Sequence, residues 1–428
     1  MLCFVVEHVK NKMRRKRLLK VLLVMVIAAS VVYYSLDSKK PTPVEIALMP
    51  SWVLQNLQKE LGQVLESSLL EHPVIPFEDN LTGEILMPLD FIDEPEFNLK
   101  NNSNPPLKKI LMWNEFYGMK HLEIGLGREP FVRAGCPINT CWFTANKTLF
   151  DSSELDALIF HANSKFTTLP ELRSVHTRYI FFLLEPPTVL DDFNTDLTPY
   201  NNTFNWTFTY RLDSDIPFPY GYVLKRNERD SSWDNINFAA GKTKMIAWFV
   251  SNCNNTSGRE RLAKTLQQYL PIDIYGKCGT KKCGTSRTWH CYEMLNSDYK
   301  FYLSFENSLC KDYITEKLYN IFDLNVIPVV YGGADYMHLL PPHSYIDVLD
   351  FPDMKTLAQL LIHLDSNDDA YNQYFVWKQY YIVVNRWAAR VRAWCKLCER
   401  LHRDHLPKVY PDMYDWFYTK GQCKIPAD

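Results

Sequence analysis

Short apolar runs, each about as long as a β-strand, recur along the chain from residue 107 onward. A first set covers 108–116, 156–162, 177–187 and 205–215, and a second covers 244–252, 271–278, 299–307, 326–333 and 344–351. Most runs are apolar at successive positions, which is typical of strands buried on both faces of a parallel sheet. Helices are expected between them, as at 257–270 and 312–325. The alternation predicts an α/β fold.

The segment DSDIPFPYGYVLKRNERDSSWDN, which begins at residue 213, separates the two sets of strands. We therefore expect two α/β domains that face a cleft, a number that suits 428 residues. No internal repeat or low-complexity segment interrupts them. The expected boundaries are 106–240 for the first domain, 241–395 for the second, and 396–428 for a cysteine-containing C-terminal tail.

The N-terminal residues have the pattern of a membrane anchor. The largely apolar run 18–36, broken by Lys20, Ser30 and Ser35, is about long enough to span a bilayer. Basic residues precede it, at Lys10, Lys12, Arg14, Arg15, Lys16 and Arg17. By the positive-inside rule, residues 1–17 form a cytosolic tail and the rest of the chain faces the lumen. A cleaved signal peptide is the alternative, but the run is long for one and no clean small-x-small site follows it.

Residues 37–105 are expected to form a stem between this signal anchor and the first domain. Within the stem, 51–70 has apolar residues at helical spacing. This helix would either associate with a second copy, giving a homodimer, or pack on the globular body.

Cysteines and glycosylation sequons agree with a lumenal body. Cys3 lies in the cytosolic tail, which leaves an even number of cysteines for an oxidising compartment. These disulfide candidates are Cys136, Cys141, Cys253, Cys278, Cys283, Cys291, Cys310, Cys395, Cys398 and Cys423. N-x-S/T sequons occur at Asn80, Asn101, Asn146, Asn201, Asn205, Asn254 and Asn255. Asn254 and Asn255 are adjacent, so we expect at most one of them to carry a glycan.

The spacing of the cysteines leaves their pairing open. Cys136 and Cys141 can pair with each other or with C-terminal cysteines. CGTKKCGTSRTWHC (278–291) has cysteine and histidine spacing that could ligate zinc, and WCKLC (394–398) has the form of a redox motif. Disulfides are the preferred interpretation for both in a lumenal protein.

Composition excludes one class of partner. The net charge of −2 has no excess of positive charge for DNA or RNA, so no nucleic-acid partner is expected. Aromatic residues make up 14% of the chain, which suits large buried cores and also sites that stack on sugar rings.

The stretch FYLSFENSLCKDYITEKLYNIF (301–322) runs from an apolar strand through a polar turn to an expected helix start. The segment that begins KMIAWFVSN at residue 244 has the same order. Ligands of α/β sheets bind at the carboxyl ends of strands, and helix N-termini favour phosphate. Arg259 lies near one helix start and Lys317 in the first turn of the other, so both suit the pyrophosphate of a nucleotide leaving group.

The carboxylate of Glu316, next to Lys317, is better suited to the ribose hydroxyls than to a phosphate. The alternative is that Glu316 and Lys317 are an ordinary solvated pair on a helix surface. The chain has neither a GxGxxG nor a GxxxxGK[ST] loop, which disfavours nicotinamide enzymes and P-loop kinases.

Glu185 follows the apolar run YIFFLL and precedes Pro186 and Pro187, which end the strand. Burial of a carboxylate at a strand end raises its pKa, as a general base near neutral pH requires. A solvated strand-end glutamate is the alternative. The triplet DSD (213–215) has the form of a metal-binding motif, but we interpret it as structural and expect no obligatory metal.

These segments together resemble the α1,3-fucosyltransferases of glycosyltransferase family 10. The resemblance covers about 107–423 and is specific. It rests on FYLSFENSLCKDYITEKLYNIF, WFVSN with its downstream arginine, FTYRLDSDIPFPYG, CPINTCWFTAN, LLEPP, SYIDVLDF and WCKLC. WNEFYG, AWFVSNC and DIYGKCG look most like the arthropod and plant-like branch.

The resemblance implies a GT-B fold, a single-pass type II Golgi protein and GDP-fucose as the donor. The first domain would then face the acceptor and the second would bind the donor. Glu185 falls on the proposed general base, Arg259 and Lys317 on pyrophosphate-binding positions, and Glu316 on the ribose-binding acid. Other donor-contacting positions correspond to Tyr302, Asn307, Tyr313, Ser251 and Asn252.

The reaction implied is one in-line, inverting transfer of L-fucose from GDP-β-L-fucose to the 3-hydroxyl of GlcNAc on a glycoprotein. It needs no covalent intermediate, and a divalent cation would at most stimulate it. The acceptor, the N-glycan core or an antenna, stays open. Pro186 and Leu212 depart from the family's common serine and polar residue. They motivate two alternatives, a weakly active or inactive lumenal homologue that binds GDP-fucose or glycans, and a transferase for another nucleotide sugar.

Overall fold

The computed structural model describes residues 105–118, 124–162, 169–171, 173–192, 195–253, 255–283, 289–384 and 386–426. The expected cytosolic tail, signal anchor, stem and stem helix lie outside these residues, as do the sequons at Asn80, Asn101 and Asn254. No helix in the described ranges has the length and apolar character needed to cross a membrane.

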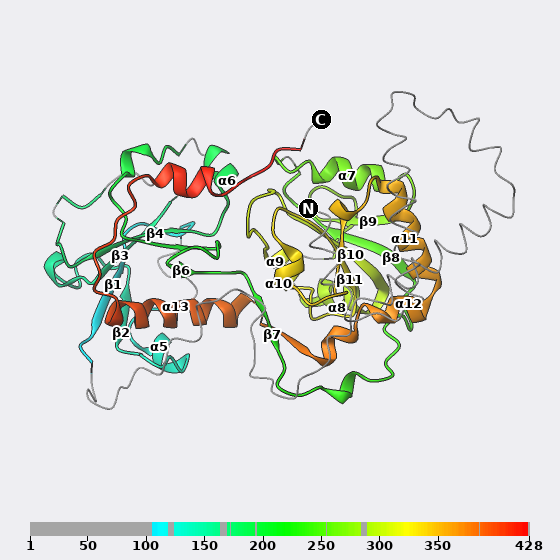
Figure 1. Cartoon of the computed structure of the whole chain (residues 1–428), viewed down its shortest axis with the longest axis horizontal. Helices are drawn as coiled ribbons and strands as arrows, with labels where there is room; N and C mark the ends of the chain where they lie inside the picture. The colour runs from blue at the N-terminus through cyan, green and yellow to red at the C-terminus, as the bar shows by residue number, and fades with distance from the viewer. Residues whose placement is uncertain are drawn as a thin grey trace, which may run out of the picture. The chain divides into compact units, whose positions relative to one another are not determined.

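The first sheet consists of parallel strands in the order β2-β1-β3-β4-β5-β6 (Figure 1). The strands are β1 (Lys108–Met112), β2 (Cys141–Thr144), β3 (Ala157–His161), β4 (Arg178–Leu183), β5 (Trp206–Thr209) and β6 (Ile216–Pro217). Every residue of β3 and of β5 is buried. The successive apolar positions in the sequence therefore report burial on both faces, as expected for a parallel sheet.

The second sheet is also parallel, with the order β12-β11-β10-β8-β9. Its strands are β8 (Lys244–Phe249), β9 (Ile272–Tyr275), β10 (Tyr299–Phe305), β11 (Ile327–Tyr331) and β12 (Ile346–Asp347). Strands β10 and β11 are buried at every position. The expected α/β class with two sets of parallel strands is confirmed.

The helices are short, apart from α11 and α13. They are α5 (Glu129–Arg133), α6 (Pro187–Asp192), α7 (Arg259–Leu266), α8 (Trp289–Asp298), α9 (Glu316–Tyr319), α10 (Tyr336–Leu339), α11 (Met354–Ser366), α12 (Asp368–Gln373) and α13 (Arg386–Arg403). Single turns of 3-10 helix lie at Ser152–Glu154, Thr198–Tyr200, Ser231–Trp233, Val348–Asp350 and Val376–Gln379, and a π-helical turn lies at Asp415–Thr419.

The helix expected at 312–325 is wrong in extent, because only Glu316–Tyr319 is α-helical. Asp312 has a φ of +61°, which is outside the helical range. Thr315 is extended and caps α9, with its side chain accepting a hydrogen bond from the Lys317 N–H. A four-residue helix has almost no macrodipole, so the phosphate contribution expected from this helix start falls away.

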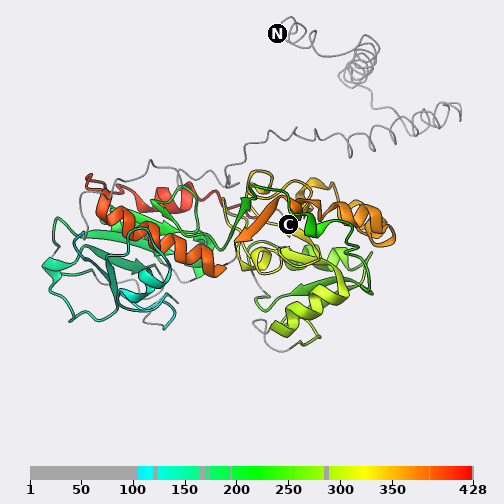
Figure 2. The same cartoon turned by 90° about the horizontal axis from the view of Figure 1, so that it is seen from below.

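Strands β7 (Tyr222–Lys225) and β13 (Tyr381–Val384) form an antiparallel pair that sequence analysis did not predict. Tyr381 lies opposite Lys225 and Val384 opposite Tyr222, so the pair joins two segments that are far apart in the sequence. Figure 2 shows the two strands, β7 in green and β13 in orange, side by side.

Helix α13 follows β13 and packs against the first sheet, in contact with β1 and β6. Two disulfides hold it there, Cys136–Cys395 and Cys141–Cys398. The domain boundary expected at residue 395 therefore falls inside a helix that is bound to the first sheet. All described residues belong to one compact unit.

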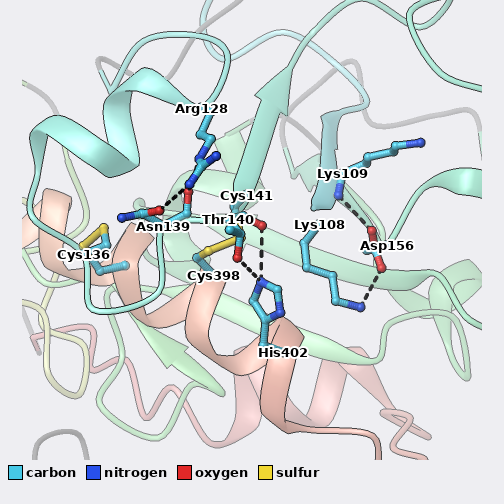
Figure 3. The surroundings of a disulfide bond; sticks show 11 residues. Lys108, Lys109, Arg128, Cys136, Asn139, Thr140, Cys141, Asp156, Cys398 and His402 are labelled. Atoms are coloured by element: carbon cyan, nitrogen blue, oxygen red, sulfur yellow. Dashed lines mark hydrogen bonds and ion pairs between the residues drawn. A yellow bond between two sulfur atoms is a disulfide. The ribbon is translucent and has the colours of Figure 1, made fainter. Parts of the chain in front are cut away.

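Figure 3 shows the Cys141–Cys398 disulfide at the start of β2. The Nε2 atom of His402 lies 3.1 Å from the Thr140 hydroxyl. Cys141, Cys398 and His402 are close enough together to surround a metal ion. Both sulfur atoms are bonded to each other, so neither is free as a thiolate ligand.

All ten candidate cysteines are paired. The other pairs are Cys253–Cys278, Cys283–Cys291 and Cys310–Cys423. The disulfide interpretation is thus confirmed over zinc binding for 278–291 and over a redox motif for 394–398. Cys136 and Cys141 take the second of the two alternatives and pair with C-terminal cysteines.

Candidate active site

The order of strands in the second sheet reverses between β8 and β10. The chain proceeds from β8 to β9 on one side and from β10 to β11 and β12 on the other. Ligands of parallel α/β sheets bind outside the carboxyl ends of strands at such a reversal. Ser251 and Asn252 follow β8, and Glu306 follows β10, so all three lie at this edge.

Glu185 lies just after β4 and immediately before α6, as the sequence predicted. Val189 donates its N–H to the Pro186 carbonyl in the first turn of α6, so the chain turns directly after the carboxylate. The hydroxyl of Tyr313, which belongs to the turn after β10, donates a hydrogen bond to Oε2 of Glu185 over 3.1 Å. The expected base therefore contacts the polar turn of the second sheet.

The pKa of Glu185 is raised above its ordinary value. Burial is the largest cause, and the charges of Glu316 and Glu306 act in the same direction. The charge of Lys317 and the Tyr313 hydrogen bond act in the opposite direction. The predicted effect of burial on this strand-end carboxylate is present, and it suits a general base.

A second link joins the base segment to the same turn. The hydroxyls of Thr188 in α6 and Ser308 after β10 lie 2.6 Å apart and are buried. With the Tyr313–Glu185 bond, this contact gives the turn two connections to the segment that carries Glu185. Neither connection has a signal in the local sequence pattern.

Arg259 is the first residue of α7 and only 3% exposed. Its guanidinium donates to the carbonyl of Phe305 over 2.8 Å and to the carbonyl of Asn252 over 2.7 Å. Its Nε donates to Glu260 over 3.2 Å. Arg259 thus joins the carboxyl ends of β8 and β10. Because a guanidinium has five N–H groups, one on each terminal nitrogen has no bond to any described residue and suits an anion.

Lys317 has three acceptors around its ammonium group. Nζ lies 3.1 Å from Oε2 of Glu306, 2.8 Å from the Thr315 hydroxyl and 3.3 Å from Oε1 of Glu316. Burial alone would lower the pKa of Lys317, but Glu306 and Glu316 outweigh it and raise that pKa. Lys317 is therefore a firmly charged cation at this edge, and not half of an ordinary solvated pair.

Glu316 is the most exposed of the groups around Lys317, with 39% of its side chain accessible, against 1% for Glu306. Burial acts to raise the pKa of Glu316, but Lys317 and local hydrogen bonds keep it below its ordinary value. Glu316 is therefore ionised and can turn towards a ligand, as the ribose role requires.

Three further predicted donor residues lie at the same edge. Ser251 and Asn252 are exposed after β8, and the Ser251 hydroxyl accepts the Lys277 N–H over 3.4 Å. Asn307 follows Glu306, and its Oδ1 is buried with no hydrogen-bond donor among the described residues. A buried amide oxygen without a donor is costly, so Asn307 suits a ligand contact.

Tyr302 and Tyr313 are both buried, at 3% and 1% exposure. Tyr302 lies inside β10 and packs edge-on against Phe249 with ring centroids 5.3 Å apart. Tyr302 therefore packs in the core next to the site, and its contact with the donor stays a prediction. Tyr313 packs edge-on against Tyr210 with centroids 5.0 Å apart, and its hydroxyl reaches Glu185. It is placed to orient the base.

Sequence analysis missed two residues that face Glu185. Tyr220 is 7% exposed and donates its hydroxyl to the Leu184 carbonyl over 3.0 Å. Tyr117 follows β1 at a φ of +48° and is 52% exposed. Partial burial and the charge of Glu185 raise the pKa of Tyr117. The one sequence signal for Tyr117 is an aromatic residue that follows an apolar run, and such residues are common.

Gly221 allows the segment after β6 to approach α9. A Cβ at this position would lie 2.4 Å from ring atoms of Tyr319. Any side chain larger than hydrogen would therefore displace Tyr319, which is buried two residues after Lys317.

The DSD triplet is bound to basic side chains. Asp213 accepts hydrogen bonds from the fully buried Arg211 and lies 3.6 Å from Lys311. Asp215 has a side chain that is 1% exposed and accepts from Tyr410 over 2.7 Å. These partners support the structural interpretation of the triplet.

The two departures from the family pattern lie near the site. Pro186 is buried directly after Glu185. Leu212 is partly buried against the core, and its N–H donates to Oδ2 of Asp312 over 3.2 Å. The Leu212 contact uses only the backbone, so the polar side chain common in the family is not needed for it.

The C-terminal segment is tied to the turn after β10. Cys423 is bonded to Cys310, Lys311 donates its N–H to the Gly421 carbonyl, and Lys424 donates to the Leu309 carbonyl, each over 2.9 Å. We call residues 420–426 the C-terminal strap. It fixes the turn that carries Asn307 and Tyr313.

The sequons within the described residues differ in accessibility. Asn146 and Asn201 are exposed. Asn205 donates to the Lys408 carbonyl over 2.9 Å and accepts from the Tyr179 N–H over 2.7 Å. Asn255 donates to Glu260 over 2.7 Å. A glycan on Nδ2 would compete with the bonds that this nitrogen donates, and Asn205 and Asn255 are only partly exposed, so we expect lower occupancy there than at Asn146 and Asn201.

The fold and the site define a glycosyltransferase built on two parallel α/β sheets. Residues 105–221 match the family described as "Fucosyltransferase, N-terminal", and residues 239–416 match "Glycosyltransferase family 10 (fucosyltransferase) C-term". The chain belongs to glycosyltransferase family 10, the fucosyltransferases, which confirms the resemblance seen in the sequence.

Relatives in Drosophila melanogaster are similar over most of their length. Alpha-(1,3)-fucosyltransferase C is 39% identical over 351 residues, which cover 75% of this chain and 79% of that protein. Glycoprotein 3-alpha-L-fucosyltransferase A is 36% identical over 360 residues, which cover 82% and 68%. A crystal structure of an α1,3-fucosyltransferase with GDP-fucose aligns with a TM-score of 0.47 and 15% identity, over 73% of this chain and 94% of that one.

Proposed function

We propose that the chain transfers L-fucose from GDP-β-L-fucose to the 3-hydroxyl of GlcNAc on glycoprotein glycans, with inversion at the fucose carbon. The observation that carries the proposal is the contact between Glu185 and the turn that leads to Lys317, made through Tyr313. It brings a carboxylate with a raised pKa next to a cationic site suited to a pyrophosphate. The names of the Drosophila relatives support fucose and the α1,3 linkage.

In the proposed reaction, Glu185 accepts the proton of the GlcNAc 3-hydroxyl as that oxygen attacks C1 of fucose. The bond from C1 to the GDP oxygen breaks in the same step, and GDP leaves with the bonding electrons. Arg259 and Lys317 stabilise the negative charge that develops on the pyrophosphate. One displacement converts the β-linked donor into an α-linked product, so no covalent enzyme intermediate is assigned.

Donor binding would rearrange the acceptors around Lys317. All three N–H groups of its ammonium already have partners, so a phosphate oxygen must replace one of them. Glu316 is the most exposed partner and the easiest to displace. Once released, its carboxylate is free to accept hydrogen bonds from the ribose hydroxyls. Ser251, Asn252 and Asn307 would complete the donor site.

The acceptor would lie between the donor and the exposed ring of Tyr117, which offers a face to a sugar. Both the core GlcNAc of an N-glycan and an antennal GlcNAc fit the proposal. No step requires a metal ion, and the carboxylates of the DSD triplet are used by Arg211 and by Tyr410. Activity measured with and without a divalent cation would show whether such an ion stimulates the transfer.

The same proposal includes the cellular setting. We place the chain in the Golgi membrane as a single-pass type II protein with a lumenal GT-B body, anchored through 18–36 and able to form a homodimer through its stem. The five disulfides of the described residues support an oxidising lumen.

The test is an assay of the purified lumenal body with GDP-fucose and a panel of core and antennal acceptors, with products identified by mass spectrometry. A parallel panel of other nucleotide sugars tests the donor. Fucosylation of one acceptor class at the 3-position is the expected result. GDP binding without turnover on any acceptor would favour a non-catalytic binding protein, and transfer of another sugar would overturn the donor.

A further inference from the structure

Glu306 is a buried carboxylate that sequence analysis did not single out. It follows the last residue of β10, and its side chain is 1% exposed. Its N–H donates to the Tyr331 carbonyl over 2.9 Å, and its Cγ would lie 3.5 Å from a Cβ at Gly332. The side chain is therefore enclosed by the ends of β10 and β11.

Among the described residues, the Glu306 carboxylate receives its hydrogen bonds from Thr315 and Lys317, around the start of α9. Oε1 accepts the Thr315 N–H over 2.8 Å, and both oxygens lie 2.9 Å from the Thr315 hydroxyl. Oε2 lies 3.1 Å from Nζ of Lys317. Thr315 is also the N-cap of α9, so the carboxylate holds both the start of that helix and the cation that the helix carries.

A buried carboxylate is costly unless charges and hydrogen bonds compensate it. Here the compensation is specific, since Lys317 supplies the opposite charge and Thr315 supplies two donors. The partner Glu316 is far more exposed and can leave Lys317 when a phosphate arrives. Glu306 cannot leave Lys317 in the same way, because its oxygens are also hydrogen-bonded to Thr315. Lys317 would therefore keep one fixed partner throughout the reaction.

We infer that Glu306 is a positioning residue that holds the Lys317 ammonium at the place where it meets the donor pyrophosphate. This inference rests on the proposed function, because it takes a nucleoside diphosphate as the ligand of Lys317. Glu306 touches neither the donor nor the acceptor, and it acts through Lys317 and the Thr315 cap. Glu316 is the exchangeable partner of the same ammonium, and Glu306 is the permanent one.

The experiment is a double-mutant cycle on the lumenal body, with the affinity for GDP measured by titration calorimetry. Glu306→Gln keeps the shape of the side chain but removes the charge, and it should weaken GDP binding about tenfold. Lys317→Ala should weaken it at least as much. If Glu306 acts through Lys317, then adding Glu306→Gln to Lys317→Ala should change the affinity less than about twofold.

Thermal unfolding of each variant separates positioning from a purely structural role. A folded Glu306→Gln variant that binds GDP as tightly as wild type, or more tightly, overturns the inference. So does a full additional loss in the Lys317→Ala background. Thr315→Val removes the hydroxyl but leaves the Glu306–Lys317 pair, so its loss of GDP affinity should be smaller than that of Glu306→Gln.

If Glu306→Gln fails to fold, Glu306→Asp provides the same comparison, because it keeps the charge but withdraws it from Lys317. It should give an intermediate affinity, and wild-type affinity in Glu306→Asp overturns the inference. A wild-type protein that binds no GDP overturns the proposed donor together with this inference. Normal wild-type binding with an unaffected Glu306→Gln overturns the inference alone.

Discussion

The hydroxyl of Tyr313 donates a hydrogen bond to Oε2 of Glu185 over 3.1 Å, across 128 positions of sequence. Glu185 lies just after β4 of the first sheet, and Tyr313 lies in the turn after β10 of the second. The bond stabilises the ionised form of the carboxylate, against the effect of burial. The turn expected to hold the donor therefore lowers the pKa of the residue expected to accept the proton.

Glu185→Gln should lower kcat by about a thousandfold, because the amide cannot accept the acceptor's proton. Its affinity for GDP should stay close to that of wild type. Burial raises the pKa of Glu185, so the ionised form is disfavoured in the folded state. Above that pKa the variant should therefore have an unchanged or higher melting temperature. Fucosyl transfer at the wild-type rate would remove Glu185 from the role of base.

Tyr313→Phe should shift the acidic limb of the kcat/KM profile to higher pH. The base must be ionised to act, so activity falls as the pH drops through its pKa. The Tyr313 hydrogen bond lowers the pKa of Glu185, and its loss leaves the pKa still higher. Tyr210→Phe is the matched control, because the Tyr210 hydroxyl is buried without a partner among the described residues. An identical shift of the acidic limb in Tyr313→Phe and Tyr210→Phe would contradict the role of the Tyr313 hydrogen bond in setting the pKa of Glu185.

Replacing Cys310 and Cys423 by serine should release the C-terminal strap from the donor turn. The disulfide closes a separation of 113 positions, so its loss should cost about 2–4 kcal/mol of unfolding free energy. The KM for GDP-fucose should also rise, since the turn carries Asn307 and Tyr313. The pair Cys283–Cys291 closes only 8 positions and serves as the control. Equal effects on KM from both pairs would contradict a specific role for the strap.

Gly221→Ala should destabilise the protein by about 1–3 kcal/mol, as overpacking does. The new Cβ would lie 2.4 Å from the Tyr319 ring. The shift of Tyr319 should also weaken GDP binding through α9. Tyr319→Ala removes the Cγ and Cδ1 atoms that the new Cβ would meet, so Gly221→Ala should cost less in that background. Thermal unfolding of the four proteins measures this coupling, and strictly additive losses would count against the contact.

Glycan occupancy should distinguish Asn146 from Asn205. Asn146→Gln in a secretory host should remove a glycan and change mobility on a gel, since Asn146 is exposed. Asn205→Gln should leave the glycan count unchanged but lower the melting temperature, because it breaks bonds to Lys408 and Tyr179. A glycopeptide that contains occupied Asn205 would refute the expectation.

Local pattern identified much of the fold and several site residues. Runs of successive apolar residues mark strands buried on both faces, because burial of a whole strand leaves no polar positions in it. The ends of those strands then point to Glu185, Arg259 and Lys317, since the carboxyl edge of a parallel sheet is where ligands bind. Resemblance to a family added the donor, which no pattern of burial can name.

The extent of α9 and the roles of Glu306 and Tyr302 were not predictable in the same way. Asp312 takes a positive φ, and Glu306 accepts the N–H of Thr315, the N-cap of α9, so the helix begins late despite a helical pattern. Tyr302 and Tyr313 lie in one polar and aromatic stretch, yet one packs in the core and the other reaches Glu185. Side-chain direction at a turn depends on what packs against it.

By itself, the sequence determined the α/β class, the two sets of parallel strands and the strand ends near which the expected base and cations lie. Only the tertiary structure decided that Cys136 pairs with Cys395, 259 positions away, and that Tyr313 meets Glu185. The physical reason is the distance along the sequence over which each kind of signal acts. Periodicity reports the burial of neighbouring residues, whereas a contact between distant segments depends on how the whole chain packs and closes its loops.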